Sequence, residues 1–177
     1  MTKTATPPTQ RLIQAYRDML DRAAAMVARA KHRGVGSVVF DAVEQTKEQM
    51  STLQELTREE ATQIGDYLLR DIHDAAEFMA EHGHELKDWL RLDTALVEDK
   101  LVQLIAVMTD QTRLELDKLA VRAAKFGAWH AGEIVGAGTL YCKACGEILQ
   151  FHRISHIPPC PKCHGTVFGR RIEGEGA

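Results

Sequence analysis

All four cysteines of this 177-residue chain lie in its C-terminal fifth, in two Cys-x-x-Cys pairs. The first pair is Cys142 and Cys145, and the second is Cys160 and Cys163. Two such pairs, brought together by a hairpin, place four thiolates around one ion in the tetrahedral arrangement that zinc prefers. The spacing therefore predicts a closed structural site for one Zn²⁺ ion. Iron suits the same four-sulfur geometry and is the alternative metal.

Three other interpretations of the cysteines fit less well. Two disulfides would suit an exported protein, but the chain shows no apolar signal segment at its start, so we expect a reducing, cytoplasmic location. The run Cys160-x-x-Cys163-His164 matches a haem-attachment pattern, which would leave the first pair unexplained. A redox-active pair normally begins a helix, and neither pair opens a helical pattern.

The predicted metal site has no position left for a catalytic water, because four thiolates fill a tetrahedron. Four histidines lie near enough in sequence to replace a cysteine ligand, but we interpret them as polar surface residues: His130, His152, His156 and His164. The chain also shows no phosphate loop, nucleophile elbow or dinucleotide fingerprint. We therefore expect no catalytic residue and no enzymatic activity.

Short β-branched and aromatic runs flank the two cysteine pairs and predict strands. They cover residues 139–141, 147–151 and 167–171. Gly146 and Gly165, beside the two pairs, suit the positive φ angles that sharp turns need. We therefore expect a small β zinc ribbon over residues 128–172, followed by a flexible tail over 173–177. A ribbon of this size buries too little apolar surface to fold alone, so the metal must supply much of its stability.

Helical periodicity fills most of the chain before the ribbon. Residues 1–9 contain two prolines and no apolar period, so we expect a disordered leader there. From residue 10 to residue 33, apolar residues recur every three to four positions, which predicts a helix. A weaker apolar pattern predicts a second helix that starts at Ser37 or Asp41, and residues 53–56 indicate a break.

A third helix is predicted from the capping box of Thr57 and Glu60 to about His82. The longest apolar stripe follows over residues 86–126, with the near-heptad spacing typical of helical hairpins and coiled coils. We therefore expect a mostly α protein, in which a long helical hairpin or bundle over residues 10–127 carries the C-terminal β ribbon. Such helices also offer a surface for formation of a homo-oligomer.

Four polar residues lie within two turns of the third predicted helix: Asp71, His73, Asp74 and Glu77. A Glu-x-x-His motif follows at Glu81 to His84, where Gly83 is expected to break the helix. Di-metal sites in helical bundles need two such motifs and two more carboxylates, and this chain has one copy. His73 and Glu77 also flank the apolar stripe of the helix rather than lie on it. We interpret the cluster as a solvated helix face.

The charge of the chain is distributed unevenly around its net value of −3. Residues 1–127 carry 17 Lys and Arg against 21 Asp and Glu, a net −4, whereas residues 128–177 carry 5 against 4, a net +1. The basic residues of the ribbon form a candidate contact surface: Lys143, Arg153, Lys162, Arg170 and Arg171.

The leading hypothesis is a non-catalytic module that binds a protein partner. The alternative is a nucleic-acid-binding or transcription-associated protein, whose affinity would fall steeply with salt. No apolar run approaches the length of a membrane span.

The segment from Trp129 to Leu140, together with the two cysteine pairs and Phe168-x-Arg170-Arg171, resembles the YbeL-like zinc-ribbon family of bacteria. The resemblance is specific over residues 128–171 and implies a bound zinc ion, a bacterial cytoplasmic protein and no established activity. It also singles out an aromatic-His-x-Gly-Glu motif before the first cysteine pair. We favour a packing role for that motif, against the end of the long helix, over a role as a contact site. Its residues are Trp129, His130, Gly132 and Glu133.

Overall fold

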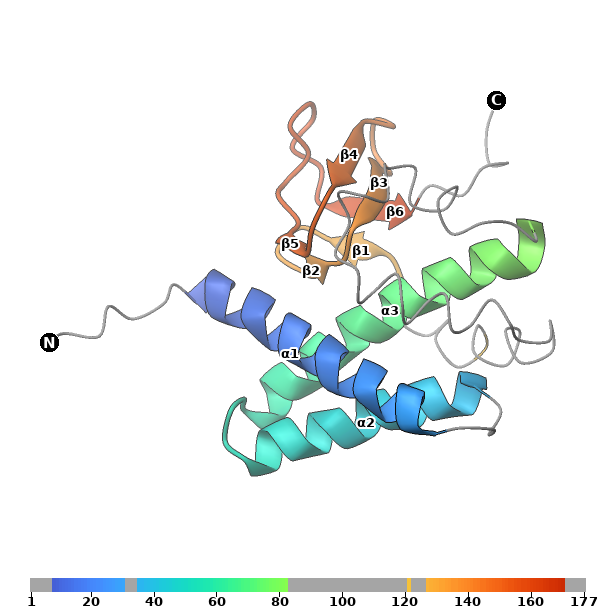
Figure 1. Cartoon of the computed structure of the whole chain (residues 1–177). Helices are drawn as coiled ribbons and strands as arrows, with labels where there is room; N and C mark the ends of the chain where they lie inside the picture. Colours follow the sequence, from blue (N-terminus) through green and yellow to red (C-terminus); the bar gives the residue numbers. More distant parts are fainter. Residues whose placement is uncertain (1–7, 31–34, 83–120, 122–126, 171–177) are drawn as a thin grey trace, which may run out of the picture.

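The computed structural model of the protein describes residues 8–30, 35–82, 121 and 127–170. In these ranges the chain forms helices α1 (Pro8–Arg29), α2 (Val35–Thr52) and α3 (Arg58–His82). The helices are followed by strands β1 (Trp129–His130), β2 (Ile134–Val135), β3 (Gly138–Cys142), β4 (Ile148–Phe151), β5 (Ser155–His156) and β6 (Val167–Arg170). The three helices pack on one another, and the β-structure lies over α1 and α3 (Figure 1).

The helices form where apolar periodicity predicts them, because each must bury one apolar stripe. Tyr16, Met19 and Ala23 of α1 are buried together with Ile64 and Ile72 of α3. The predicted break at residues 53–56 is confirmed, and α2 begins slightly before the predicted start. The predicted helix over residues 86–126, with its coiled-coil spacing, lies outside the described residues except for residue 121.

The capping box predicted at the start of α3 is confirmed. The Thr57 N–H donates to Glu60 Oε2 at 3.0 Å, and the Glu60 N–H donates to Thr57 Oγ1 at 3.1 Å. Two amides that the helix leaves without partners are therefore satisfied. Glu60 also pairs with Arg11 of α1, and the hydrogen bond from Arg11 lowers the pKa of Glu60. The cap thus joins the start of α3 to α1.

The strands form two antiparallel sheets. The larger has the order β1-β6-β3-β4, and the smaller pairs β2 with β5. Strands predicted at residues 139–141, 147–151 and 167–171 correspond to β3, β4 and β6, whereas the short strands β1, β2 and β5 were not predicted. Alternation places Leu140, Leu149 and Phe168 in a buried cluster, with Trp129 of β1 packed among them.

The ribbon and the helices share a hydrophobic core. Ile134, Ala137 and Ile154 of the β-structure belong to the same buried cluster as Tyr16 of α1 and Ile72 of α3. A zinc ribbon is too small to bury much apolar surface within itself. This ribbon therefore gains stability from the helices as well as from its own sheet and from metal.

We predict that Thr57→Ala lowers the free energy of unfolding by about 1 kcal/mol, because it removes the side-chain cap of α3. Chemical denaturation followed by circular dichroism measures the change. Thr62→Ala is the matched control, since Thr62 is exposed within α3 and only bonds back to the Arg58 carbonyl. Equal stability of Thr57→Ala and the parent would contradict the capping role.

Candidate metal centre

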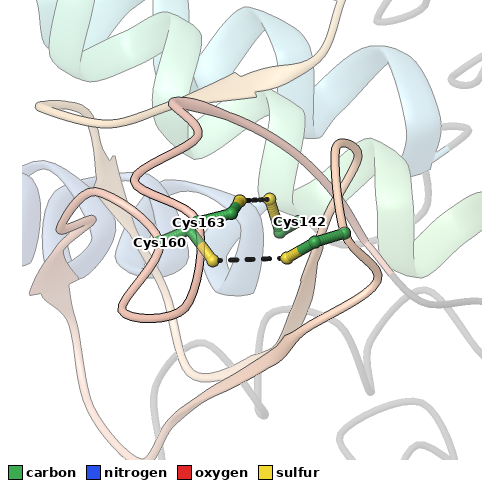
Figure 2. Close-up of side chains that lie close together, drawn as sticks. Cys142, Cys160 and Cys163 are labelled. Carbon is green, nitrogen blue, oxygen red and sulfur yellow. Dashed lines mark hydrogen bonds between the residues drawn. The ribbon is translucent and has the colours of Figure 1, made fainter.

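The four cysteine sulfurs converge on one point between the two turns of the ribbon. All four Sγ atoms lie within 4.8 Å of one another. The Sγ atoms of Cys142 and Cys163 are 3.6 Å apart, and so are those of Cys145 and Cys160 (Figure 2). Zinc–sulfur bonds of about 2.3 Å in a tetrahedron imply sulfur–sulfur separations of about 3.8 Å. The donor set and its spacing therefore fit one structural zinc ion, as the sequence predicts.

Each cysteine pair lies on a turn closed by a backbone hydrogen bond. The Gly146 N–H donates to the Cys142 carbonyl at 2.8 Å, and the His164 N–H donates to the Cys160 carbonyl at 2.9 Å. Gly146 has the expected positive φ of 74°. The equivalent positive φ in the second turn belongs to His164, at 59°, and not to Gly165 as predicted.

Gly165 is favoured for a different reason, which is that a side chain there would have little space. A Cβ atom at this position would lie 3.1 Å from Cys142 Sγ and 3.2 Å from Cys163 Sγ. It would thus crowd two of the four sulfurs. The prediction of positive φ at Gly165 was wrong because the second turn reaches its bend one residue earlier.

The thiols influence the ionisation of one another. Desolvation opposes ionisation of Cys160, but the backbone N–H groups of Cys163 and Lys162 lower the pKa of its thiol to about 7. The Gly165 N–H donates to Cys163 Sγ at 3.4 Å and favours that thiolate, yet the neighbouring Cys145 thiol raises the pKa of Cys163 to about 12. Four adjacent thiols do not all ionise by themselves, because their negative charges repel one another. A bound divalent cation offsets this repulsion and stabilises the four thiolates.

We predict that Cys142→Ser loses the metal, because the substitution removes one of the four sulfur ligands, and this ligand is buried. After dialysis against a chelator, the metal content measured by atomic emission should fall from one ion per chain toward zero, and the amide signals of the ribbon should collapse. His152→Ala is the control, since this exposed histidine is interpreted as a surface residue. Equal metal loss in both variants would contradict the four-cysteine site.

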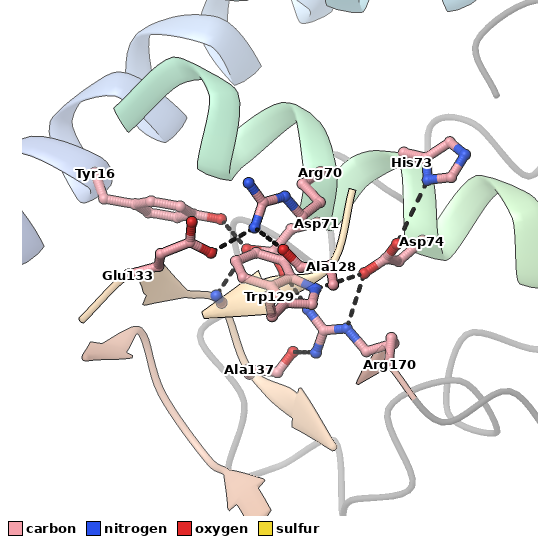
Figure 3. A network of polar contacts seen from close by, with 11 residues as sticks. Tyr16, Arg70, Asp71, His73, Asp74, Ala128, Trp129, Glu133, Ala137 and Arg170 are labelled. Carbon is pink, nitrogen blue, oxygen red and sulfur yellow. Dashed lines mark hydrogen bonds and ion pairs between the residues drawn. The ribbon is translucent and has the colours of Figure 1, made fainter. Parts of the chain in front are cut away.

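A buried polar network joins the ribbon to the helices (Figure 3). The Arg170 side chain of β6 is 2% exposed and forms an ion pair with Asp71 of α3, which is fully buried. Asp71 Oδ2 also accepts hydrogen bonds from Tyr16 Oη at 2.6 Å and from the Gly136 N–H at 2.7 Å. Arg170 Nε lies 3.4 Å from Asp74 Oδ2. Side chains from α1, α3 and β6 thus meet at one carboxylate.

This network corrects two predictions. Arg170 was predicted to belong to the exposed contact surface, but it is buried because β6 turns it to the same side as Phe168. Asp71 and Asp74 were predicted to lie on a solvated helix face, but that face is the one that the ribbon covers. No second metal cluster is present among the described residues, where the only candidate group is the four cysteines.

The aromatic-His-x-Gly-Glu motif packs against α3. The Trp129 indole N–H donates to Asp74 Oδ2 at 3.0 Å, and the Arg70 guanidinium lies 4.5 Å from the Trp129 ring centroid. Glu133 Oε2 accepts from Arg70 Nη1 at 2.5 Å and from the His130 N–H at 2.9 Å. Trp129 and Glu133 therefore have the favoured packing role, although the helix that they contact is α3.

The other two residues of the motif, His130 and Gly132, lie in the turn that leads from Trp129 to Glu133. The His130 side chain is exposed, with its Nδ1 3.7 Å from Glu133 Oε1, and Gly132 has a φ of 100°. We call the contacts of Trp129, Glu133 and Arg170 with α3 the docking interface. One signal for it was present in the sequence: alternation along β6 places residue 170 on the buried side with Phe168.

The remaining residues of the predicted contact surface are placed as follows. Lys143, Arg153 and Lys162 are exposed on the ribbon. Lys162 Nζ lies 3.4 Å from a Glu147 carboxylate oxygen, in a surface pair that contributes little stability. Arg171 lies outside the described residues.

Asp71 provides a pH-dependent test of the docking interface. Burial raises the pKa of Asp71 to about 6, although Arg170, Tyr16 and the Gly136 N–H oppose the shift. Since this folded-state pKa exceeds the unfolded value near 4, the stability contributed by Asp71 is fully present below pH 4 and is lost as the pH rises through 6.

We predict that the Asp71 carboxyl carbon titrates with a midpoint near pH 6 in the folded protein, as followed by NMR of labelled aspartate. In Arg170→Gln the midpoint should rise further, because the attraction that favours the carboxylate is removed. Asp71→Asn identifies the resonance by its disappearance. A midpoint unmoved by the Arg170 change would show that the two side chains do not interact.

Two knuckle turns, four converging thiols and a small antiparallel sheet define a zinc-ribbon protein. A family model described as a zinc-ribbon containing domain matches residues 27–172, and the chain belongs to that family. This membership confirms the resemblance found from the sequence.

Three relatives of the chain, all from Escherichia coli, share one name, which assigns no function. The chain is 32% identical over 129 residues to the "Uncharacterized protein YbeL" of Escherichia coli K12, covering 73% of this chain and 79% of the relative. The proteins of the same name from E. coli O6:H1 and O157:H7 match equally well. No solved structure matches the chain. None of the helices in the described ranges has the length and apolar character needed to cross a membrane.

Proposed function

We propose that this chain is a non-catalytic adaptor of the bacterial cytoplasm, whose zinc ribbon binds a protein partner while the helices hold the ribbon in a fixed orientation. The zinc ion has a structural role in this proposal, because four thiolates complete its coordination. The docking interface supports the fixed orientation: Arg170 and Trp129 attach the sheet to α3 through buried contacts.

The observation that carries the proposal is an apolar strip on the side of the sheet opposite Leu140 and Phe168. Ile148 of β4 is 42% exposed, and Val167 of β6 is 36% exposed. Tyr141, which is half-buried, lies on the same side of the sheet on β3, the strand between β4 and β6, where it pairs with Ile148 and with Gly169. We call Tyr141, Ile148 and Val167 the outer strip. Exposed apolar side chains that cross adjacent strands are typical of protein-binding surfaces.

The charges beside the outer strip favour an acidic partner. Lys143 immediately follows β3, and its N–H donates to the Val167 carbonyl at 3.0 Å, so it lies at one end of the strip. Lys162 is held near Glu147, the residue before Ile148. Exposed lysines at the rim of an apolar contact steer association and select partners of opposite charge.

Nucleic-acid binding is the alternative, since Lys143, Arg153 and Lys162 would also neutralise phosphates. Three cations on a chain of net charge −3 give weak attraction to a polyanion. Two of the three side chains in the outer strip are aliphatic, whereas single-stranded nucleic acids bind mainly on aromatic platforms. We therefore place the protein partner first.

We predict that Ile148→Glu abolishes capture of a partner from lysate by the tagged protein, because a charge replaces the most exposed side chain of the apolar contact. Leu53→Glu is the matched control: Leu53 is 63% exposed but lies at the turn between α2 and α3. Both variants should keep one metal ion per chain. Mass spectrometry of the captured proteins, with and without nuclease treatment, gives the result.

The outcomes separate the two functions. A partner that survives nuclease, is lost with Ile148→Glu and is retained with Leu53→Glu supports the adaptor. Partners that disappear with nuclease would replace it with the nucleic-acid function. A partner retained by all variants would contradict the assignment of the outer strip as the contact surface.

A further inference from the structure

Two routes through the β-structure connect the metal centre to the helices. The first follows β3 and β6. Cys142 ends β3 and pairs with Phe168, while Leu140 of β3 pairs with Arg170. An ion shared by Cys142 and Cys163 joins the end of β3 to the turn that leads into β6. The register of β3 with β6, which brings Arg170 to Asp71, therefore includes Cys142, a residue of the metal site.

The second route follows the chain before Cys160. The Ile157 N–H donates to the Glu133 carbonyl at 2.9 Å, and the Gly132 N–H donates to the Ile157 carbonyl at 2.9 Å. These bonds continue the pairing of β2 with β5, in which Ile134 lies opposite His156. Ile134 is also part of the helical core. The second cysteine pair is thus tied to residues that are buried against α1 and α3.

We propose that metal binding and docking of the ribbon are thermodynamically coupled, so that loss of the metal releases the ribbon and uncovers the face of α1 and α3 beneath it. This goes beyond partner binding, because it makes metal occupancy a control on which surface of the protein is exposed. It does not depend on whether the outer strip binds a partner.

The energetic argument rests on the small size of the ribbon. Zinc binding supplies most of the folding free energy of isolated zinc modules, so a sheet that loses the metal loses much of what holds its strands in register, even with the helices beside it. Without that register, Asp71 loses Arg170 and the Gly136 N–H, and Asp74 loses the Trp129 indole. The Asp71 carboxylate on this helix face is then exposed to water, and so are the apolar side chains that the ribbon covered.

Coupling of this kind is reciprocal. If the metal strengthens docking by some factor, docking strengthens metal binding by the same factor. A change on α3 that touches no cysteine should therefore weaken zinc binding. Asp74 is such a position, because it accepts from Trp129 at 3.0 Å and from Arg170 at 3.4 Å, both of which belong to the ribbon.

The test measures zinc affinity of the full chain by competition with a chromogenic chelator. We expect Asp74→Ala to bind zinc about tenfold more weakly than the parent, within the usual range of coupling between sites. Asp66→Ala is the matched control: Asp66 lies on the same helix but faces Lys47 of α2, 3.5 Å away. Parental affinity in Asp74→Ala, or equal weakening in both variants, would overturn the proposal.

A second measurement uses the unaltered protein and is informative even if Asp74→Ala fails to fold. Amide hydrogen exchange is compared between the zinc-loaded and metal-free forms, with the thiols kept reduced. We expect exchange near Asp71 of α3 and Tyr16 of α1 to rise at least about tenfold without zinc, because Asp71 then loses Arg170 and the Gly136 N–H as partners. Cys142→Ser in the presence of zinc should match the metal-free form. Equal helix protection in both forms would overturn the coupling.

Discussion

The ion pair between Arg170 and Asp71 is the constraint on which the arrangement of the two parts of this protein depends. Both side chains are almost completely removed from water. Bringing two charges into such a site costs more than their attraction returns unless every remaining polar atom is satisfied, so a buried pair seldom adds net stability. The raised pKa of Asp71 agrees with this, because burial outweighs the attraction of Arg170. The pair therefore specifies where the ribbon docks, while apolar contacts hold it there.

Those apolar contacts come from the parts of the ribbon that carry no metal. Ile134 and Ile154 enter the helical core, whereas Phe168 and Leu140 remain in the core of the sheet. The small sheet β2–β5 thus packs against the helices, whereas the larger sheet carries the metal site and the outer strip. On the other side of the larger sheet, Ile148 and Val167 are exposed.

The features that the sequence predicted are those with short-range signals. The cysteine spacing defines the metal site, and the contact between Thr57 and Glu60 spans a single helical turn. Arg170 and Asp71 are 99 residues apart, and each looks like an ordinary surface charge when read in its own segment. Only the alternation along β6 hinted at a buried arginine. Arg70 was missed for the same reason, since its partners Trp129 and Glu133 come from the ribbon.

The separation of Asp71 from Arg170 also has a consequence for synthesis of the protein. At about 5–20 residues per second, the ribosome adds Arg170 about 5–20 s after Asp71. During that interval Asp71 lacks two of its partners, Arg170 and the Gly136 N–H, and the ribbon does not yet cover α1 and α3. Transiently exposed apolar surface favours aggregation, so we expect the newly made chain to depend most on chaperones in this interval.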